Sequence, residues 1–263
     1  MSTLSYANFV HQIVDSYLQA GGRTDAIPSL SSTVAISSSV LLRIPRILIL
    51  APHPDDECLM AGFALRARDE WNAEVHVLPY GFGSDRSRRA ARIQELKDAL
   101  QVLDFKLIDP RTAGGTEKLT AAEFQSVMDS LSPDVVLSPH QMDEHPAHIE
   151  AATLVQNWFA QQNKTEAILP VWLQTEYWQQ NPGANAFVPL NPEHVIKMGE
   201  ALQKHRGEVS RNPYHLRLPA WCMDQSRRAQ ELIGGFGASA PAGQFIFGQL
   251  LQRVDMQSKA PKP

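Results

Sequence analysis

The sequence predicts an α/β fold in which a Rossmann-like, largely parallel sheet carries helices on both faces. From residue 46 onward, short apolar runs alternate with longer segments that have the spacing of amphipathic helices. The runs at 47–50 and 134–138 are each followed directly by a cluster of polar residues. Because the carboxyl ends of parallel strands share one edge of a sheet, we expect the two clusters to meet there.

Composition narrows the class of protein. A chain of 263 residues with 43% hydrophobic residues can bury one large core. The formal net charge of −4 does not favour nucleic acid or an anionic membrane surface as a partner. No apolar run has the length of a membrane span and no signal pattern opens the chain, so we expect a cytoplasmic protein without stable membrane insertion. The sequence leaves open whether the chain forms a homo-oligomer.

The chain divides into three parts. Residues 1–44 form an N-terminal extension expected to pack on the core, with a helix at 4–20 and either one or two strands or an ordered loop at 29–42. Residues 45–258 form the main domain. Residues 259–263 are expected to be a flexible tail.

The main domain is expected to alternate strands with helices. The predicted strands are 47–50, 73–79, 105–108, 134–138 and 168–178, and the predicted helices are 55–65, 86–103, 120–131, 146–158, 192–205 and 224–233. Thr120 caps the third of these helices, and Glu123 completes a capping box. The aromatic residues Trp172, Tyr177 and Trp178 either belong to the core or offer a face on which a sugar ring stacks.

The first polar cluster is Pro52-His53-Pro54-Asp55-Asp56-Glu57. Prolines end the strand, and acidic residues suit the first turn of a following helix. His53 and Asp56 are spaced to place an imidazole nitrogen and a carboxylate oxygen on one metal ion. Asp55 then points elsewhere and is left for proton transfer. Acidic residues at this position would repel a dinucleotide pyrophosphate, which argues against a nucleotide-dependent oxidoreductase.

The second polar cluster repeats this arrangement. Pro146 opens a helix, so His145 and His148 lie on one face of its first turn. His53, Asp56 and His148 together would make a three-ligand site with an open fourth position, as expected of catalytic zinc. The alternative is that these histidines and acids are surface residues or helix caps.

Three motifs carry a resemblance to a known family. Pro52-His53-Pro54-Asp55-Asp56-Glu57 resembles the (A/P)HPDDE motif of the LmbE-like, or PIG-L, superfamily of zinc-dependent N-deacetylases. His145-Pro146-Ala147-His148 resembles its HPDH motif, and Arg92-Ile93-Gln94-Glu95 resembles the start of its R-x-x-E-x-x-x-A-x-x-x-L helix. The resemblance covers residues 46–160 well and implies the same fold.

The resemblance also implies roles for single residues. The ligands of Zn²⁺, or of another divalent transition metal such as Fe²⁺, would be His53, Asp56 and His148. Asp55 would be the general base that deprotonates the attacking water. His145 would steady the tetrahedral intermediate and protonate the leaving amine, and Arg92 would face the substrate.

These roles predict a hydrolase that removes the acetyl group from an N-acetylated amino sugar, such as N-acetylglucosamine in a glycolipid, glycan or glycoconjugate. The substrate would be a small molecule or glycan with an N-acetyl group. Two alternatives remain: a deacylase acting on a non-sugar amide of a secondary metabolite, and a metal-binding protein with weak or lost catalysis.

The chain departs from the family pattern in three places. Ala147 replaces the aspartate of HPDH, so we expect Asp143 or Glu144 to hold His145 instead. Gly207 and Glu208 stand where Ser-Gln is usual, and residues 241–245 lack the tyrosine and glutamate of a Y-A-E-x-F pattern.

Overall fold

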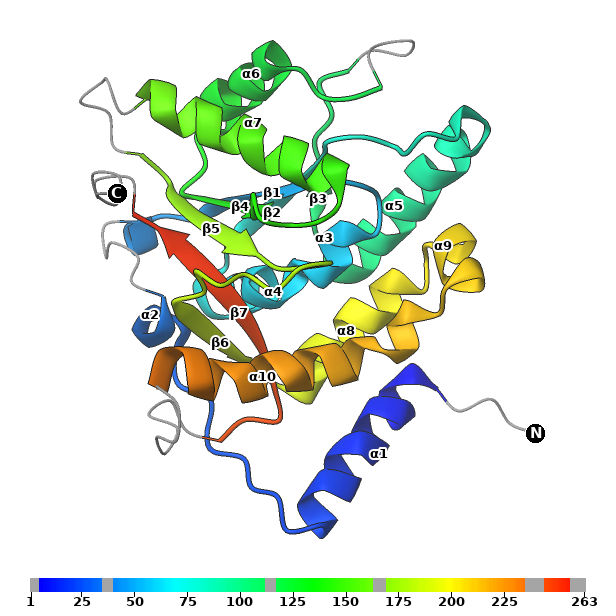
Figure 1. The fold of residues 1–263 in the computed structure, drawn as a ribbon, viewed down its shortest axis with the longest axis vertical. Coiled ribbons are helices and arrows are strands. Elements are labelled where there is room, and N and C mark those ends of the chain that lie inside the picture. Colours follow the sequence, from blue (N-terminus) through cyan, green and yellow to red (C-terminus); the bar gives the residue numbers. More distant parts are fainter. Residues whose placement is uncertain (1–4, 35–39, 112–116, 163–168, 235–243, 256–263) are drawn as a thin grey trace.

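A single seven-stranded sheet organises the computed structural model, which describes residues 5–34, 40–111, 117–162, 169–234 and 244–255. The strand order is β3-β2-β1-β4-β5-β7-β6, and β7 alone runs antiparallel to its neighbours (Figure 1). The strands are β1 (Arg46–Ala51), β2 (Glu74–Pro79), β3 (Lys106–Leu107), β4 (Val135–Pro139), β5 (Val171–Thr175), β6 (Ala186–Leu190) and β7 (Phe247–Val254). The prediction of a Rossmann-like, largely parallel sheet is confirmed.

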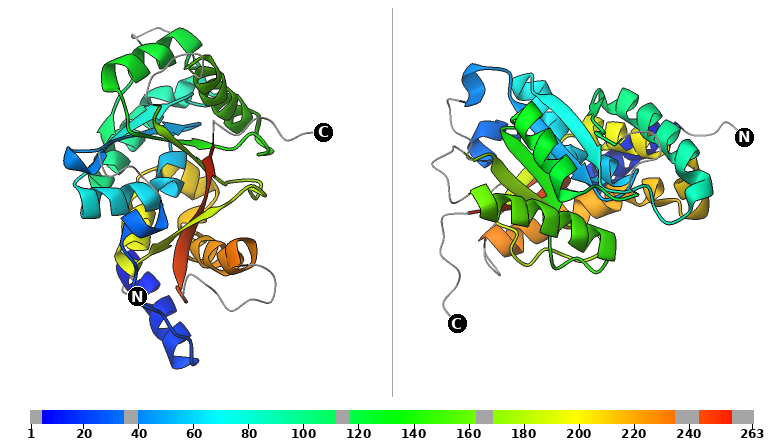
Figure 2. Two further views of the ribbon diagram at one scale, coloured as in Figure 1. Left: turned by 90° about the vertical axis from the view of Figure 1, so that its left-hand side faces the viewer. Right: turned by 90° about the horizontal axis from the view of Figure 1, so that it is seen from above.

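Helices cover both faces of the sheet (Figure 2). They are α1 (Tyr6–Gln19), α2 (Leu30–Thr33), α3 (Asp56–Leu59), α4 (Ala61–Trp71), α5 (Arg89–Leu103), α6 (Ala121–Leu131), α7 (Pro146–Gln162), α8 (Pro192–Leu202), α9 (Arg206–Arg211) and α10 (Leu218–Gly234), with short 3₁₀ turns η1 (Val40–Leu42), η2 (Arg86–Arg88) and η3 (Tyr214–Leu216). Within the described part of the chain, no helix is both long and apolar enough to cross a lipid bilayer.

The aliphatic run of β1 supplies both halves of the core. Ile47 and Ile49 pack in one hydrophobic cluster with α4, α5 and α8, whereas Leu48 and Leu50 pack in a second cluster with α6 and α7. Side chains of a strand alternate between its two faces, so a strand covered on both faces must be apolar throughout. All four side chains are fully buried, as this argument requires.

The last two strands, β6 and β7, were not predicted. β6 contains Pro189, which is unusual inside a sheet, and β7 mixes apolar residues with Gln249, Gln252 and Arg253. Neither segment has the continuous apolar run that identified the parallel strands. The helix predicted at 55–65 is interrupted at Met60, which separates α3 from α4. The capping box of Thr120 and Glu123 on α6 is confirmed.

The N-terminal segment joins the core through α1, which packs on α8 at the lower end of the molecule (Figure 1). Tyr6 is buried there, and its hydroxyl donates to the carbonyl of His215 at 2.7 Å. The strands suggested at 29–42 are wrong in the described residues, which form α2 and η1. Residues 35–39 and the predicted tail at 259–263 lie outside the described residues.

Candidate active site

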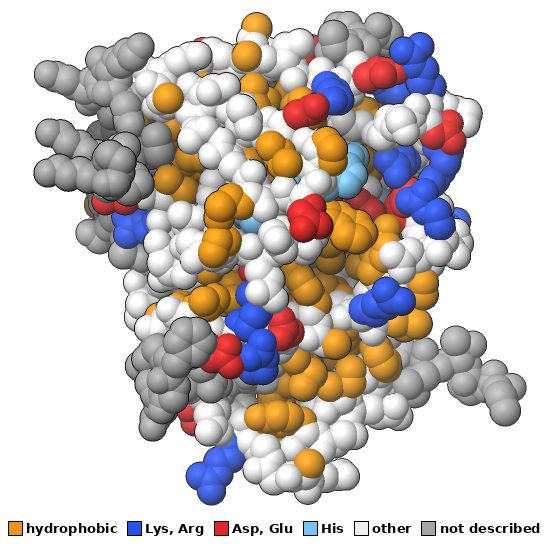
Figure 3. Space-filling view, in the orientation of Figure 1, with side chains coloured by type: hydrophobic (Ala, Val, Ile, Leu, Met, Phe, Trp, Pro, Cys, Tyr) orange, Lys and Arg blue, Asp and Glu red, His pale blue; other side chains and the backbone are white. Residues whose placement is uncertain are grey.

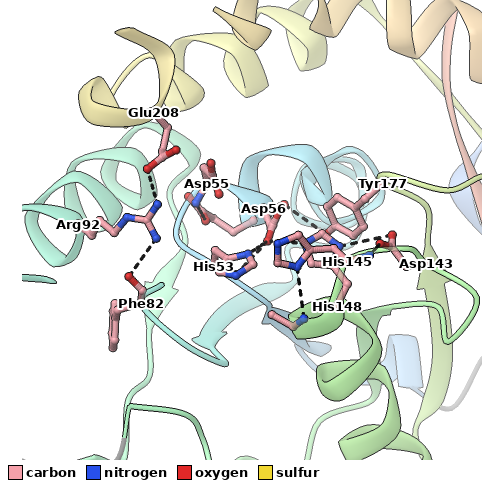
Figure 4. Close-up of polar contacts among 12 residues, drawn as sticks. His53, Asp55, Asp56, Phe82, Arg92, Asp143, His145, His148, Tyr177 and Glu208 are labelled. Atoms are coloured by element: carbon pink, nitrogen blue, oxygen red, sulfur yellow. Dashed lines mark hydrogen bonds and ion pairs between the residues drawn. The ribbon is translucent and has the colours of Figure 1, made fainter. Parts of the chain in front are cut away.

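The two polar clusters meet at one edge of the sheet, as the sequence predicted. β1 and β4 are adjacent and parallel, and β2 lies on the other side of β1, so the order of strands reverses at this point. The segment after β1 carries His53, Asp55 and Asp56, and the segment after β4 carries His145 and His148 (Figure 4). Ligands of open α/β sheets bind at such switch points.

Two imidazole nitrogens converge on one carboxylate oxygen. Asp56 Oδ2 lies 3.2 Å from His53 Nδ1 and 3.3 Å from His148 Nε2. Ligands held about 2.05 Å from a tetrahedral zinc ion are separated by about 3.3 Å, so these spacings match those of a zinc coordination shell. Two histidine nitrogens and one carboxylate oxygen are also a ligand set that zinc takes in catalytic sites. The donor atoms of His53, His145 and His148 all lie within 4.8 Å of one another.

Asp143 and Tyr177 hold the ring of His148 in place. Its Nδ1 lies 3.4 Å from Asp143 Oδ2, and the ring of Tyr177 packs edge-on against it with centroids 4.8 Å apart. His148 is 1% exposed. A carboxylate on the far nitrogen fixes the tautomer of a metal-binding histidine and directs the other nitrogen to the metal.

The electrostatics of this cluster favour a bound cation. Burial alone raises the pKa of Asp56, but the imidazoles of His148 and His53 outweigh it and hold the pKa below its usual range. Burial lowers the pKa of His148, whereas the Asp56 and Asp143 carboxylates raise it, with a net result of about 9. A positive charge is therefore favoured between these carboxylates.

Asp55 points away from the histidine cluster, as predicted. The backbone of Asp55 has φ of 124°, a conformation that residues other than glycine rarely adopt. The Asp55 N–H donates to Glu57 Oε2 at 2.8 Å. Burial, followed by the negative charges of Asp56 and Glu57, raises the pKa of the Asp55 carboxyl well above its usual value. Such a shift towards neutral pH is characteristic of a carboxylate that exchanges protons.

A buried triad lies behind Asp55. Glu57 Oε1 accepts from Cys58 Sγ at 3.2 Å and lies 2.6 Å from His205 Nε2. None of the three residues is exposed to solvent. Burial and the neighbouring Glu57 raise the pKa of the Cys58 thiol well above its usual value, which indicates a packing role.

His145 lies beside the proposed ligands without a carboxylate on its ring. Its ring centroid is 4.9 Å from those of both His53 and His148. The Ala147 N–H donates to His145 Nδ1 at 3.3 Å, so the neutral ring carries its hydrogen on Nε2. Burial, followed by the charges of the two neighbouring histidines, lowers the pKa of His145.

The prediction that Asp143 or Glu144 holds His145 needs correction. Asp143 Oδ1 accepts from the His145 backbone N–H at 2.8 Å, and its other oxygen faces His148. Glu144 is exposed. The ring of His145 is held by the backbone of Ala147 instead.

The side chains of His53, Asp55, Asp56, His145 and His148 line a cleft of about 780 Å³. Figure 3 shows the histidines in a hollow of the surface, with basic side chains on one side and hydrophobic side chains below. Arg92 lines the cleft, but its guanidinium donates to the Phe82 carbonyl at 3.0 Å and forms an ion pair with Glu208 (Figure 4). Arg92 is thus held by the protein rather than free for a ligand.

The aromatic patch divides between core and cleft. Trp172 is buried and stacks on Phe159, so for this residue the core alternative is correct. Tyr177 lines the cleft against His148, and Trp178 lines it with 65% of its surface exposed. A large exposed indole at the edge of a cleft can stack on a ligand.

Comparison with known families agrees with the motifs. Residues 48–159 match the sequence profile of the PIG-L family, described as GlcNAc-PI de-N-acetylase. Residues 48–159 therefore carry the domain of the PIG-L, or LmbE-like, family. The matched PIG-L segment spans both polar clusters and Arg92, and it ends before His205 and Glu208. No curated protein sequence matches the chain.

Solved structures share the PIG-L fold with this chain at low sequence identity. The 4-carboxy-2-hydroxymuconate hydratase of Pseudomonas putida KT2440 has a TM-score of 0.61 at 17% identity, covering 84% of this chain and all of that one. The N,N'-diacetylchitobiose deacetylase of Pyrococcus horikoshii has a TM-score of 0.60 at 14% identity over 92% of each chain. The A40926 pseudoaglycone deacetylase has a TM-score of 0.57 at 16% identity, covering 80% and 97%. The fold therefore carries more than one reaction.

Sequence reasoning missed the residues that support the site from a distance. Glu57, His205 and Glu208 hold Asp55 and Arg92 in place. Asp143 was expected to hold His145; it binds the backbone of His145, and its second contact, with the ring of His148, was missed. Glu208 stood out only as a departure from the family pattern. Its pairing with Arg92, 116 residues away, has no local signal in the sequence.

Proposed function

We propose that this protein is a zinc-dependent hydrolase that removes the acetyl group from an N-acetylated amino sugar. The observation that carries the proposal is the convergence of His53 Nδ1 and His148 Nε2 on Asp56 Oδ2, at 3.2 and 3.3 Å, beside a raised-pKa carboxyl in a cleft. His53, Asp56 and His148 would hold the metal. Zinc bound there would polarise the acetyl carbonyl and lower the pKa of a coordinated water to about 7.

Asp55 acts as the general base. Its carboxylate takes the proton of the attacking water, and its raised pKa supports this role because a base works best when its pKa lies near the working pH. Two nearby carboxylates, Asp56 and Glu57, contribute to the shift. A divalent cation held by His53, Asp56 and His148 would offset part of the shift.

His145 stabilises the developing negative charge and assists departure of the amine. Ala147 N–H occupies Nδ1, which leaves the hydrogen on Nε2 to donate to the carbonyl oxygen as its charge grows. The lowered pKa of His145 makes it a stronger acid once protonated. Protonation of the leaving nitrogen is essential because an amine leaves poorly as an anion.

The amino sugar is supported by the family and by the cleft. The family profile is described by a GlcNAc-PI de-N-acetylase, and relatives with this fold include a diacetylchitobiose deacetylase. A volume of about 780 Å³ is large enough for one or two sugar rings. Trp178 and Tyr177 offer aromatic faces beside the proposed metal ligands, and such faces stack on the apolar side of a sugar.

Variants separate metal binding from proton transfer. Asp55→Asn should retain zinc and lose acetate release from N-acetylglucosamine compounds by about 10²–10⁴-fold, the usual contribution of a general base. His148→Ala should lose both zinc and activity. Zinc content and acetate release are measured on the same preparations, with Glu144→Gln as the control. Undiminished turnover by Asp55→Asn would remove it as the base.

The same measurements, extended to non-sugar N-acetyl compounds, distinguish the two alternative functions. Acetate release from a non-sugar N-acetyl compound, without release from any sugar, identifies a deacylase of another amide. Stoichiometric zinc without any amide hydrolysis indicates that the site binds metal without this reaction.

A further inference from the structure

We propose that the wall of the cleft formed by α9 and η3 binds an anionic group of the substrate, a carboxylate or phosphate remote from the acetyl group, through Arg211 and Arg217. This inference rests on the proposed function and extends it to a substrate class. Four arginines line one cavity with the candidate catalytic residues: Arg88 of η2 and Arg92 of α5, which lie beside this wall, Arg211 of α9, and Arg217, which directly follows η3.

Glu208 organises three of these arginines. Its carboxylate pairs with Arg88 at 2.8 Å and makes ion pairs with Arg92 and Arg211. The Glu208 side chain is only 2% exposed. Burial alone raises the pKa of Glu208, but Arg92 and Arg88 outweigh it and lower the pKa, so the carboxylate is ionised. One buried carboxylate therefore fixes three guanidinium groups.

Two glycines make room for this cluster. A Cβ at Gly207 would lie 1.6 Å from a terminal nitrogen of Arg88, and a Cβ at Gly83 would lie 2.4 Å from a terminal nitrogen of Arg92. Gly207 and Glu208 are the two residues that replace the usual Ser-Gln of the family. The two replacements act together, because one admits a guanidinium and the other neutralises part of the added charge.

Arg217 adds a positive charge to this cluster. Glu95 accepts from the Gly207 N–H at 2.9 Å and lies 3.9 Å from Arg88, so it assists Glu208 in pairing that arginine. Across the described residues, no ion pair joins a carboxylate to Arg217, whose side chain is exposed. The carboxylates of Asp55, Asp56, Asp85 and Glu117 line other parts of the same cleft, so the unpaired positive charge is local to Arg217 and the exposed Arg211.

Arg211 and Arg217 present this charge to the cleft. The Arg211 side chain is 68% exposed, so most of its five donors remain available while Glu208 orients it. Tyr214 lines the same cleft, where burial, followed by the charges of Asp55 and Glu208, raises its pKa to about 12 against the opposing effect of Arg211.

The chemistry of this wall selects for anions. Guanidinium groups bind carboxylate and phosphate oxygens with two parallel hydrogen bonds, and an arginine already oriented by the protein loses less entropy on binding. Asp55 and Asp56 line the same cleft among the candidate catalytic and metal-binding residues, and their carboxylates repel an anion. A substrate with its acetyl group at the proposed metal ligands would therefore place its anionic group at α9 and η3.

Matched substrates test this preference. The comparison is kcat/KM for acetate release from methyl N-acetylglucosaminide, N-acetylglucosamine 1-phosphate and a carboxymethyl N-acetylglucosaminide. We expect about a tenfold preference for an anionic compound over the neutral one, and Arg217→Gln or Arg211→Gln should remove it. The preference should also weaken as salt is raised. The ranking of phosphate and carboxylate identifies the anion.

Arg227→Gln is the control, because Arg227 lies on α10 outside the cleft and pairs with Asp224 and Glu231. This variant should leave the ratio of kcat/KM for the anionic compound to kcat/KM for the neutral compound unchanged. Equal kcat/KM for neutral and anionic compounds in the wild-type protein would overturn the inference and leave the deacetylase proposal standing.

A binding measurement keeps the inference testable without turnover. Glucosamine 1-phosphate and methyl glucosaminide are titrated calorimetrically into zinc-loaded wild-type protein and Arg217→Gln. Tighter binding of the phosphate that is lost in Arg217→Gln supports the anion site, even where no acetate is released and the proposed function fails. Equal binding of the two amines contradicts the site.

Discussion

Glu57 Oε1 lies 2.6 Å from His205 Nε2, and neither side chain is exposed to solvent. The other oxygen of Glu57 accepts from the Asp55 N–H, where the backbone has the unusual φ of 124°. His205 is 148 residues away from Glu57 in the chain. One buried carboxylate thus connects the residue before α9 to the backbone of the proposed base, which makes His205 a positioning residue.

Replacing His205 should reduce turnover more than substrate binding. In His205→Ala we expect kcat to fall about 10–100-fold with KM nearly unchanged, because Asp55 loses the support that fixes its backbone. His205→Gln should recover most of kcat, since an amide N–H can still donate to Glu57. The control is His11→Ala on the exposed face of α1. A folded His205→Ala protein with wild-type kcat would exclude this role.

Asp143 should control metal affinity through His148. Asp143→Asn keeps an oxygen for the His145 N–H but removes the negative charge beside His148 Nδ1. We expect zinc affinity to fall about 10–100-fold, measured by competition with a chelator of known affinity. Glu144→Gln is the matched control, because Glu144 is an exposed neighbour. Equal zinc affinities in the two variants would show that Asp143 does not support the ligand.

Gly199 permits the contact between α1 and α8. A Cβ at this position would lie 2.0 Å from the ring of Tyr6, which is buried. Gly199→Ala should therefore cost about 1–3 kcal/mol of stability, or about 2–4 °C in Tm for each kcal/mol. Limited proteolysis after α1 should also become faster. Glu200→Ala, one residue further on an exposed position, should do neither. An unchanged Tm in Gly199→Ala would contradict the described packing of α1.

His194 should make the protein less stable in mild acid. Burial lowers its pKa in the folded state despite the Asp69 carboxylate 3.2 Å from Nε2. As the pH falls below about 6.5, His194 takes up a proton in the unfolded chain before it does so in the folded protein. The folded protein therefore keeps the stability that neutral His194 gives above that pH and loses it below. His194→Gln should show a smaller loss of Tm between pH 8 and 5. Parallel Tm curves would argue against this contribution.

The parallel half of the fold was predictable because its signals are local. A strand buried on both faces must be apolar, a proline ends it, and residues three apart meet in the first turn of a helix. These rules identified β1 and β4 and brought His53, Asp56 and His148 together correctly. They rest on neighbouring residues and need no knowledge of distant contacts.

The rest depended on contacts between distant segments. β7 inserts antiparallel between β5 and β6, a pairing that no local pattern specifies. The supporting residues of the site have the same property, since His205 lies 148 residues from Glu57 and Glu208 lies 116 residues from Arg92. Gly207 and Glu208 were visible in the sequence as departures from the family, but their purpose depends on Arg88 and Arg92.

The most direct test of the deacetylase proposal is acetate release from N-acetylglucosamine compounds by the purified protein, before chelation, after chelation and after zinc is returned. We expect one zinc per chain, activity that disappears with the chelator, and activity that returns in proportion to the zinc restored. Acetate release that persists in the metal-free protein would contradict the role assigned to His53, Asp56 and His148.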